Sequence, residues 1–335
     1  MNWDERRLGR HLKLRDLNIL MTVAQCGSMG KAAVQLSLSQ PAISKSIADM
    51  ERMLGVRLLD RSAKGIEVTL FGRALLGRGS VAFDELKQAV KHIEFLADPT
   101  SGELRIGTTI ALSLGFIPAV VEQFAKQYPG VVLHLSPNEP EATYRLLEQR
   151  NVDLTIARVF SNNVAEHLEM EALYEESYVV VAGVTNPWTQ RRKIKLGDLV
   201  NEPWILPLPD SPTGAIVAEA FRASGVEVPR AAVFSSTVPA RTALLATGRF
   251  LTMVPDSVLA NPIAGPPLKV LPLRLPTTRR TIGIITLRNR TITPIAAVFM
   301  EAARRAAKLM SPPLNRGRSG SRQSGGVALA RRLDG

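Results

Sequence analysis

Residues 31–46 have the sequence Lys31-Ala-Ala-Val-Gln-Leu-Ser-Leu-Ser-Gln-Pro-Ala-Ile-Ser-Lys-Ser46. The pattern predicts two short helices joined by a tight polar turn, and the first of them extends from Met29 to Leu36. Ser39 can cap the second helix, and Pro41 stands near its start, where a missing N–H costs no hydrogen bond. An apolar stripe with i, i+4, i+7 spacing then faces inward through Ile43, Ile47 and Met50. The stretch therefore predicts a helix-turn-helix, with an ordinary helical hairpin as the plain alternative.

The start of the second helix is the candidate DNA-reading surface. In a helix-turn-helix, the first residues of the second helix reach base edges in the major groove. The face away from the apolar stripe carries Gln40, Ser44 and Lys45. We predict that the DNA-binding residues of the two helices and the turn are Ser28, Lys31, Ser39, Gln40, Pro41, Ser44 and Lys45.

The flanking sequence extends this unit on both sides. Upstream, an apolar pattern from Leu14 to Ala24 predicts a supporting helix that ends before Gly27. Downstream, two short apolar runs enclose Ser62-Ala-Lys-Gly65, which predicts a hairpin with a basic tip. Such a wing would bring Arg61 and Lys64 to DNA phosphates or to a minor groove.

Four motifs carry a resemblance to a known family: Ser28-Met-Gly-Lys-Ala-Ala-Val-Gln-Leu36, Ser39-Gln-Pro-Ala-Ile-Ser44, Leu54-Gly-Val-Arg-Leu-Leu-Asp-Arg61 and Thr69-Leu-Phe-Gly72. Through them the chain resembles the LysR-type transcriptional regulators, densely over about the first hundred residues and as a looser pattern to about residue 309. The resemblance implies a DNA-binding regulator of transcription. It also implies two C-terminal lobes similar to a periplasmic binding protein, joined by two chain crossings, with a small-molecule effector in the cleft. A fainter resemblance points to the branch that controls aromatic-acid catabolism or sugar uptake.

The composition agrees with the prediction of a DNA-binding regulator but does not establish it. The 335 residues allow two or three domains, and the net charge of +12 favours an anionic partner such as double-stranded DNA. The single cysteine, Cys26, has no partner for an intramolecular disulfide, and we expect a small buried apolar side chain rather than a redox sensor. The N-terminus has no apolar signal-peptide core and no stretch has eighteen uninterrupted apolar residues, so we expect a cytoplasmic protein without a membrane partner.

A long segment without proline, residues 70–98, predicts one helix with a heptad seam. Apolar or small residues recur in two interleaved series of seven-residue spacing: Leu76, Phe83, Val90 and Ala97, and Gly79, Leu86 and Ile93. This pattern favours a dimerisation helix, and the alternative is an amphipathic helix that packs on its own domain. We therefore expect the helix to pair two chains in a homodimer. The family resemblance, rather than the seam, adds a homotetramer as an alternative and RNA polymerase as a further candidate partner.

The C-terminal part alternates strands and helices, which predicts parallel α/β sheets in two lobes. We place the winged helix-turn-helix at 1–69, the linker helix at 70–98, a hinge at 99–102 and the effector domain at 103–310. The second lobe covers about 176–278. The Ser, Gly and Arg content of 311–335 predicts a disordered basic tail.

Polar residues follow several of the predicted strands, where an α/β sheet binds its ligand and where helix N-termini favour negative charge. The candidate effector-binding residues are Thr108, Thr109, Ser113, Arg158, Ser211, Thr213, Ser236 and Thr237. Each hydroxyl has an alternative role as a helix cap, and Arg158 has one as a solvated surface residue. The convergence of Thr109, Ser211 and Thr237 at predicted helix starts favours an organic acid, with a neutral sugar as the rival ligand.

Nothing in the sequence points to catalysis, a metal or a cofactor. The four histidines are dispersed without a zinc-binding spacing, and Gly72–Gly79 resembles a phosphate-binding loop only superficially, since it has Arg78 in place of the lysine and no preceding strand. We therefore expect no enzyme. A DNA-binding protein that needs no ligand, and an enzyme built on the α/β region, stay open as alternatives.

Overall fold

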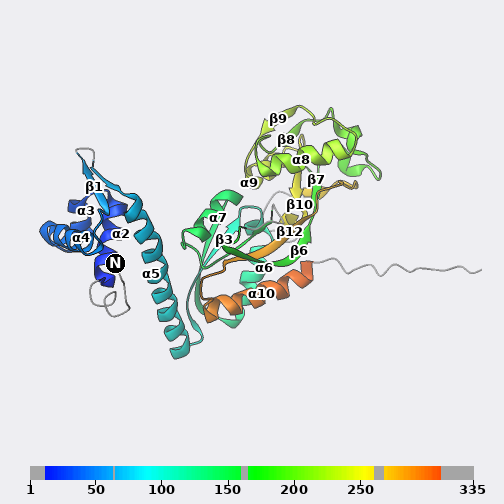
Figure 1. The fold of residues 1–335 in the computed structure, drawn as a ribbon. Coiled ribbons are helices and arrows are strands. Elements are labelled where there is room, and N and C mark those ends of the chain that lie inside the picture. The colour runs from blue at the N-terminus through cyan, green and yellow to red at the C-terminus, as the bar shows by residue number, and fades with distance from the viewer. Residues whose placement is uncertain (1–11, 63–64, 160–164, 260–267, 311–335) are drawn as a thin grey trace, which may run out of the picture.

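The computed structural model describes residues 12–62, 65–159, 165–259 and 268–310. A small N-terminal helical unit and a larger α/β region lie on either side of one long helix, α5 (Figure 1). The predicted tail, 311–335, lies outside the described residues. Within the described ranges, no helix is both long enough and apolar enough to cross a membrane.

The N-terminal unit is a winged helix-turn-helix. Its elements are α2 (Leu14–Cys26), α3 (Met29–Gln35), α4 (Gln40–Leu54), β1 (Leu59–Ser62) and β2 (Gly65–Val68). The predicted inward stripe of α4 is buried against Leu20 and Ala32, and the small side chain of Ala32 lets the helices approach closely. Gly27 ends α2 with a left-handed backbone at φ 63°, a conformation that glycine adopts without strain.

Helix α5 (Leu70–Ala97) connects this unit to the α/β region. Its start is fixed by Thr69, whose hydroxyl accepts a hydrogen bond from the Gly72 amide at 3.0 Å. Gly72 is required there, because a Cβ atom would lie 2.2 Å from the Leu58 carbonyl oxygen. Further along, Gly79 packs against the Leu17 side chain of α2. Part of the N-terminal half of the predicted heptad seam is therefore covered by α2 of the same chain.

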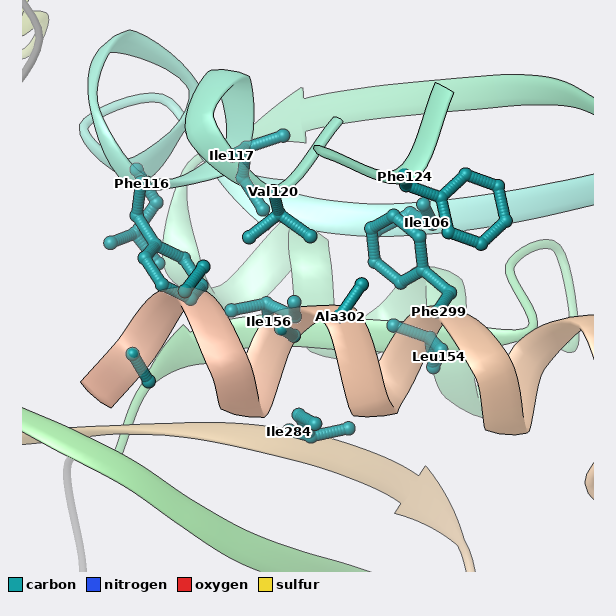
Figure 2. Packing of buried hydrophobic residues seen from close by; sticks show 14 of the residues in the cluster. Ile106, Phe116, Ile117, Val120, Phe124, Leu154, Ile156, Ile284, Phe299 and Ala302 are labelled. Atoms are coloured by element: carbon teal, nitrogen blue, oxygen red, sulfur yellow. The ribbon is translucent and has the colours of Figure 1, made fainter. Parts of the chain in front are cut away.

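The first lobe contains a five-stranded sheet in the order β4-β3-β5-β12-β6. Its strands are β3 (Ser101–Thr109), β4 (Gly130–Asn138), β5 (Leu154–Arg158), β6 (Leu168–Glu176) and β12 (Arg280–Leu287), and its helices are η1 (Leu112–Leu114), α6 (Phe116–Gln127), α7 (Pro140–Glu148) and α10 (Pro294–Met310). Helices α6 and α10 lie together on one face of the sheet, where Phe124 and Phe299 meet edge to face at 5.3 Å (Figure 2). Helix α7 buries Leu147 against a second apolar cluster.

The second lobe contains another five-stranded sheet, in the order β11-β7-β10-β8-β9. Its elements are β7 (Tyr178–Gly183), η2 (Pro187–Gln190), η3 (Leu196–Leu199), β8 (Trp204–Leu206), α8 (Pro212–Ala223), β9 (Ala231–Phe234), α9 (Val238–Leu245), β10 (Leu251–Pro255), η4 (Asp256–Leu259) and β11 (Leu268–Val270). Trp204 is the centre of its core. The indole ring packs edge-on against Phe221 at 5.3 Å, and its N–H donates to the Leu199 carbonyl at 2.7 Å.

The expectation of parallel sheets was wrong for part of each lobe. Strand β3 runs parallel to β4 and β5, but β12 runs antiparallel to β5 and β6. In the second lobe β7 is antiparallel to β10 and β11. The reason is the hinge: the chain passes from β6 directly into β7 and returns from β11 to β12, so no crossover helix sets the direction of these strands.

The amphipathic pattern of residues 112–128 predicts a single helix, but the structure interrupts it. A short 3₁₀ turn is followed by α6, with Gly115 between them in a non-helical conformation. A Cβ atom on Gly115 would lie 1.9 Å from the Ser257 carbonyl oxygen, so the chain passes η4 at backbone distance here.

Candidate functional site

The start of α4 is exposed and held in place by polar contacts. Ser39 caps the helix by accepting a hydrogen bond from the Ala42 amide at 3.3 Å. Gln40 and Lys45 are exposed, and Ser44 is half-buried. Ser28 caps α3 through the Lys31 amide at 3.5 Å. The two serines therefore position the helices, whereas the side chains of Gln40, Lys45 and Lys31 are available to an outside partner.

Two contacts that the sequence pattern did not reveal fix the orientation of α4. The Ser46 hydroxyl donates to the Asp16 carboxylate of α2 at 2.7 Å. The Glu51 carboxylate accepts from the Leu58 and Leu59 amides at 2.8 and 3.2 Å, which joins α4 to the first strand of the wing. Since groove contacts depend on the helix angle, these contacts preorganise the surface.

The wing is an antiparallel hairpin in which Leu59 pairs with Val68 and Ser62 with Gly65. It is attached to the helical unit by the Ile66 amide, which donates to the Gly27 carbonyl at 3.3 Å. The backbone of Arg61 belongs to β1, and Lys64 lies outside the described residues. The assignment of both side chains to DNA phosphates stays a prediction.

We predict that the exposed amide of Gln40 forms hydrogen bonds with base edges. Replacing Gln40 by alanine should then cost about 1–3 kcal/mol of operator binding and relax the preference at one base position. Binding to random DNA should change little. Fluorescence anisotropy with specific and random duplexes measures both. Equal losses of affinity for the two duplexes would show that Gln40 does not read bases.

A second candidate site is a cavity between the lobes that is partly open to solvent. Four of the predicted effector residues line it: Thr109, Arg158, Thr213 and Ser236. The structure adds residues that the sequence did not single out, chiefly Asn138, Glu139, Tyr178 and Arg241. Both lobes contribute to the lining.

Arg158 is buried rather than solvated, which excludes its alternative role as a surface arginine. Its guanidinium pairs with the Glu176 carboxylate and donates to the Tyr178 hydroxyl at 2.7 Å. Burial by itself would lower the pKa of Arg158, but Tyr178 and Glu176 raise it above the ordinary value. Ser257 donates to the other Glu176 oxygen at 2.6 Å. This network of polar side chains lies where β6 passes into β7, so it connects the two lobes at the hinge.

Arg241 of α9 is in a different state. Its side chain is 1% exposed, and its Nε and Nη1 atoms have no hydrogen-bond partner among the described residues. Burial lowers the pKa of this guanidinium. A buried donor without an acceptor is costly, and a buried charge more so. The signal in the sequence is one arginine inside an otherwise uncharged stretch, Val238–Leu245, and only the fold shows that it lines the cavity.

The remaining predicted effector residues do not line the cavity. Ser211 caps α8 through the Gly214 amide at 3.0 Å, which is its alternative role. The Ser113 hydroxyl donates to the Ile110 carbonyl at 2.8 Å. Thr237 precedes α9 without a side-chain cap. Thr108 is fully buried beside the lining residue Thr109, and its hydroxyl oxygen has no partner within the described ranges.

A buried charge network attaches α5 to the first lobe. Asp84 of α5 accepts hydrogen bonds from Arg290, at 2.9 Å, and from Arg150, at 2.5 Å. Asp153 accepts from Arg290 at 3.1 Å and from Lys91 of α5 at 2.9 Å. The two carboxylates thus share Arg290 between the helix and the lobe. Away from this contact, α5 leaves apolar side chains uncovered: Leu86, Val90, Ile93 and Leu96 are 46%, 54%, 65% and 70% exposed.

Comparison with known proteins identifies the family. The model of the bacterial regulatory helix-turn-helix protein, lysR family, matches residues 14–73, and the LysR substrate binding domain matches residues 97–308. The chain belongs to the LysR family. It is therefore a DNA-binding transcriptional regulator with an effector-binding domain. The predicted family and the predicted fold class are confirmed.

Individual LysR-family relatives match over nearly their whole length. The transcriptional dual regulator GltC of Bacillus subtilis is 26% identical over 294 residues, which cover 87% of this chain and 96% of that protein. The regulator PcaQ of Agrobacterium fabrum is 24% identical over 298 residues, covering 89% and 96%. Among solved structures, the LysR-family regulator CbnR has a TM-score of 0.61 at 24% identity, covering 88% of this chain and 99% of CbnR. CbnR has also been solved in complex with its target DNA, with a TM-score of 0.53 at 25% identity, covering 88% and 100%.

Proposed function

We propose that this LysR-family regulator responds to a small organic acid bound between its two lobes. The observation that carries the proposal is Arg241, a buried guanidinium on the cavity wall with two nitrogens unpartnered among the described residues. A carboxylate is the best acceptor for such a group, because its two oxygens match the guanidinium fork and neutralise its charge.

Two helix N-termini at the cavity also support an anion. Thr213 lies in the first turn of α8, and Ser236 lies just before α9, so two helix N-termini approach the ligand space. Helix N-termini favour negative charge. A neutral sugar could accept hydrogen bonds from Arg241 but would leave its charge uncompensated in a buried position. The arginine therefore favours the acid over the sugar.

The proposed mechanism is a change in the arrangement of the lobes. A ligand in this cavity touches both lobes, and it shifts their equilibrium only as far as it binds one arrangement better than another. The first lobe is attached to α5 through Asp84 and Asp153, so a movement of that lobe is carried to the helix that holds the winged unit. Two recognition helices must reach half-sites about one DNA turn apart, and a change at α5 alters their spacing.

Calorimetry on the full-length protein tests the ligand class. Aromatic, sugar-derived and short aliphatic carboxylates are compared with the amides of the same skeletons. We expect at least one acid to bind and its amide to bind about a hundredfold more weakly, because a charge-assisted hydrogen bond is worth about 1.5–3 kcal/mol.

The matched variant is Arg241→Leu. It should lose the same hundredfold for the acid while its melting temperature stays equal or rises, since an unpaired buried charge has been removed. Unchanged acid affinity in the variant would place the ligand elsewhere. Binding of neutral sugars alone would contradict the organic acid.

A further inference from the structure

The inter-lobe cavity has an acidic wall as well as a basic one. Glu139, the residue before α7, lines the cavity from the first lobe, and Arg241 lines it from the second. The Glu139 carboxylate does not cap α7, and the Arg241 Nε and Nη1 atoms have no hydrogen-bond partner among the described residues. The two opposite charges therefore face one small space from opposite lobes and attract each other across it.

Glu139 is an exposed residue that lines this cavity. Desolvation raises its pKa, repulsion from Glu141 raises it further, and Arg241 opposes both effects. Arg158, the other arginine that lines the cavity, already has Glu176 as its partner. A cationic group on a ligand would compensate Glu139 in the way that a carboxylate compensates Arg241.

A ligand with a carboxylate alone would suit Arg241 but would face repulsion from Glu139. We infer that the effector carries both a carboxylate and an ammonium group, as an amino acid does. The carboxylate pairs with Arg241 of the second lobe, and the ammonium pairs with Glu139 of the first. This inference rests on the proposed function and adds an ammonium group to the carboxylate proposed there. Such a dipolar ligand joins the lobes through its own two ends.

The test uses calorimetry on the full-length protein with three matched series: L-amino acids, the 2-hydroxy acids of the same skeletons and the corresponding acids without either group. We expect an amino acid to bind at least about tenfold more tightly than its hydroxy and unsubstituted partners, since one charge-assisted contact is lost in each. The variant Glu139→Gln should remove this advantage and leave the unsubstituted acid bound equally or more tightly. Because the Glu139 side chain makes no helix cap, the variant should fold normally.

The control is Glu141→Gln, which removes a neighbouring exposed carboxylate that does not line the cavity. It should keep the preference for amino acids. If hydroxy or unsubstituted acids bind as tightly as amino acids to the wild type, or if Glu139→Gln keeps the preference, the ammonium site is wrong while the carboxylate site stands. If no acid of any series binds, both the inference and the proposed function fail.

Discussion

Replacing both Leu86 and Ile93 by aspartate should convert the protein to monomers and remove high-affinity operator binding. Both side chains are exposed in the single chain, at 46% and 65%, and lie on the heptad seam of α5. Fully burying a Leu or Ile side chain is worth about 1.5–3 kcal/mol, and about half of each of these side chains is exposed, so losing four of them across a dimer should cost roughly 3–6 kcal/mol. That is on the order of two to four powers of ten in the dimer dissociation constant.

Sedimentation equilibrium measures the assembly, and anisotropy with operator DNA measures its consequence. The control is His92→Asp, an equally drastic change at an exposed position of α5 outside the seam. It should leave the assembly unchanged. A double variant that sediments like the wild type would show that the exposed face of α5 does not pair the chains.

Replacing Asp84 by alanine should be the most destabilising single change away from the apolar cores. Asp84 is 6% exposed and lies between the guanidinium groups of Arg150 and Arg290. Its removal leaves two like charges close together and only partly compensated by Asp153. Breaking a buried ion pair on one side typically costs about 3–5 kcal/mol.

Denaturant unfolding of the full-length protein checks this value against Glu85→Ala. Glu85 neighbours Asp84, but its side chain is 37% exposed, and surface pairs contribute about 1 kcal/mol or less. Asp84→Ala should also detach α5 from the first lobe, which hydrogen exchange in α5 would report. Equal losses for the two variants would mean that the network adds little to the attachment.

The helix-turn-helix was predictable because its information is local. Ser39, Pro41 and the stripe through Ile43 and Ile47 lie within nine residues, and their helical spacing by itself indicates caps and a buried face. The length of α5 followed in the same way from an uninterrupted heptad pattern. The pattern did not show which faces of α5 are covered. One face contacts Leu17 of α2, another contacts the first lobe, and the face with the seam is exposed.

The cavity was only half predictable. Thr109 and Arg158 are the last residues of the neighbouring parallel strands β3 and β5, so they lie where an α/β sheet typically binds its ligand. Ser211 obeys the same rule but is used as a helix cap, and sequence cannot distinguish the two roles. Arg241 lies inside a helix and Glu139 before another, and no local rule brings them together. Likewise, Asp84 and Arg290 are 206 residues apart, so only the fold reveals their pairing.

An acid bound in the cleft should change how this regulator binds DNA. The direct measurement is an operator titration of the full-length protein with and without the acid that calorimetry identifies, in wild type and Arg241→Leu. Coupling between two sites is typically about 1–3 kcal/mol, so operator affinity should change at least about fivefold in the wild type and not in the variant. An acid that binds the wild type without changing operator affinity or footprint, or that changes both proteins equally, would contradict this mechanism.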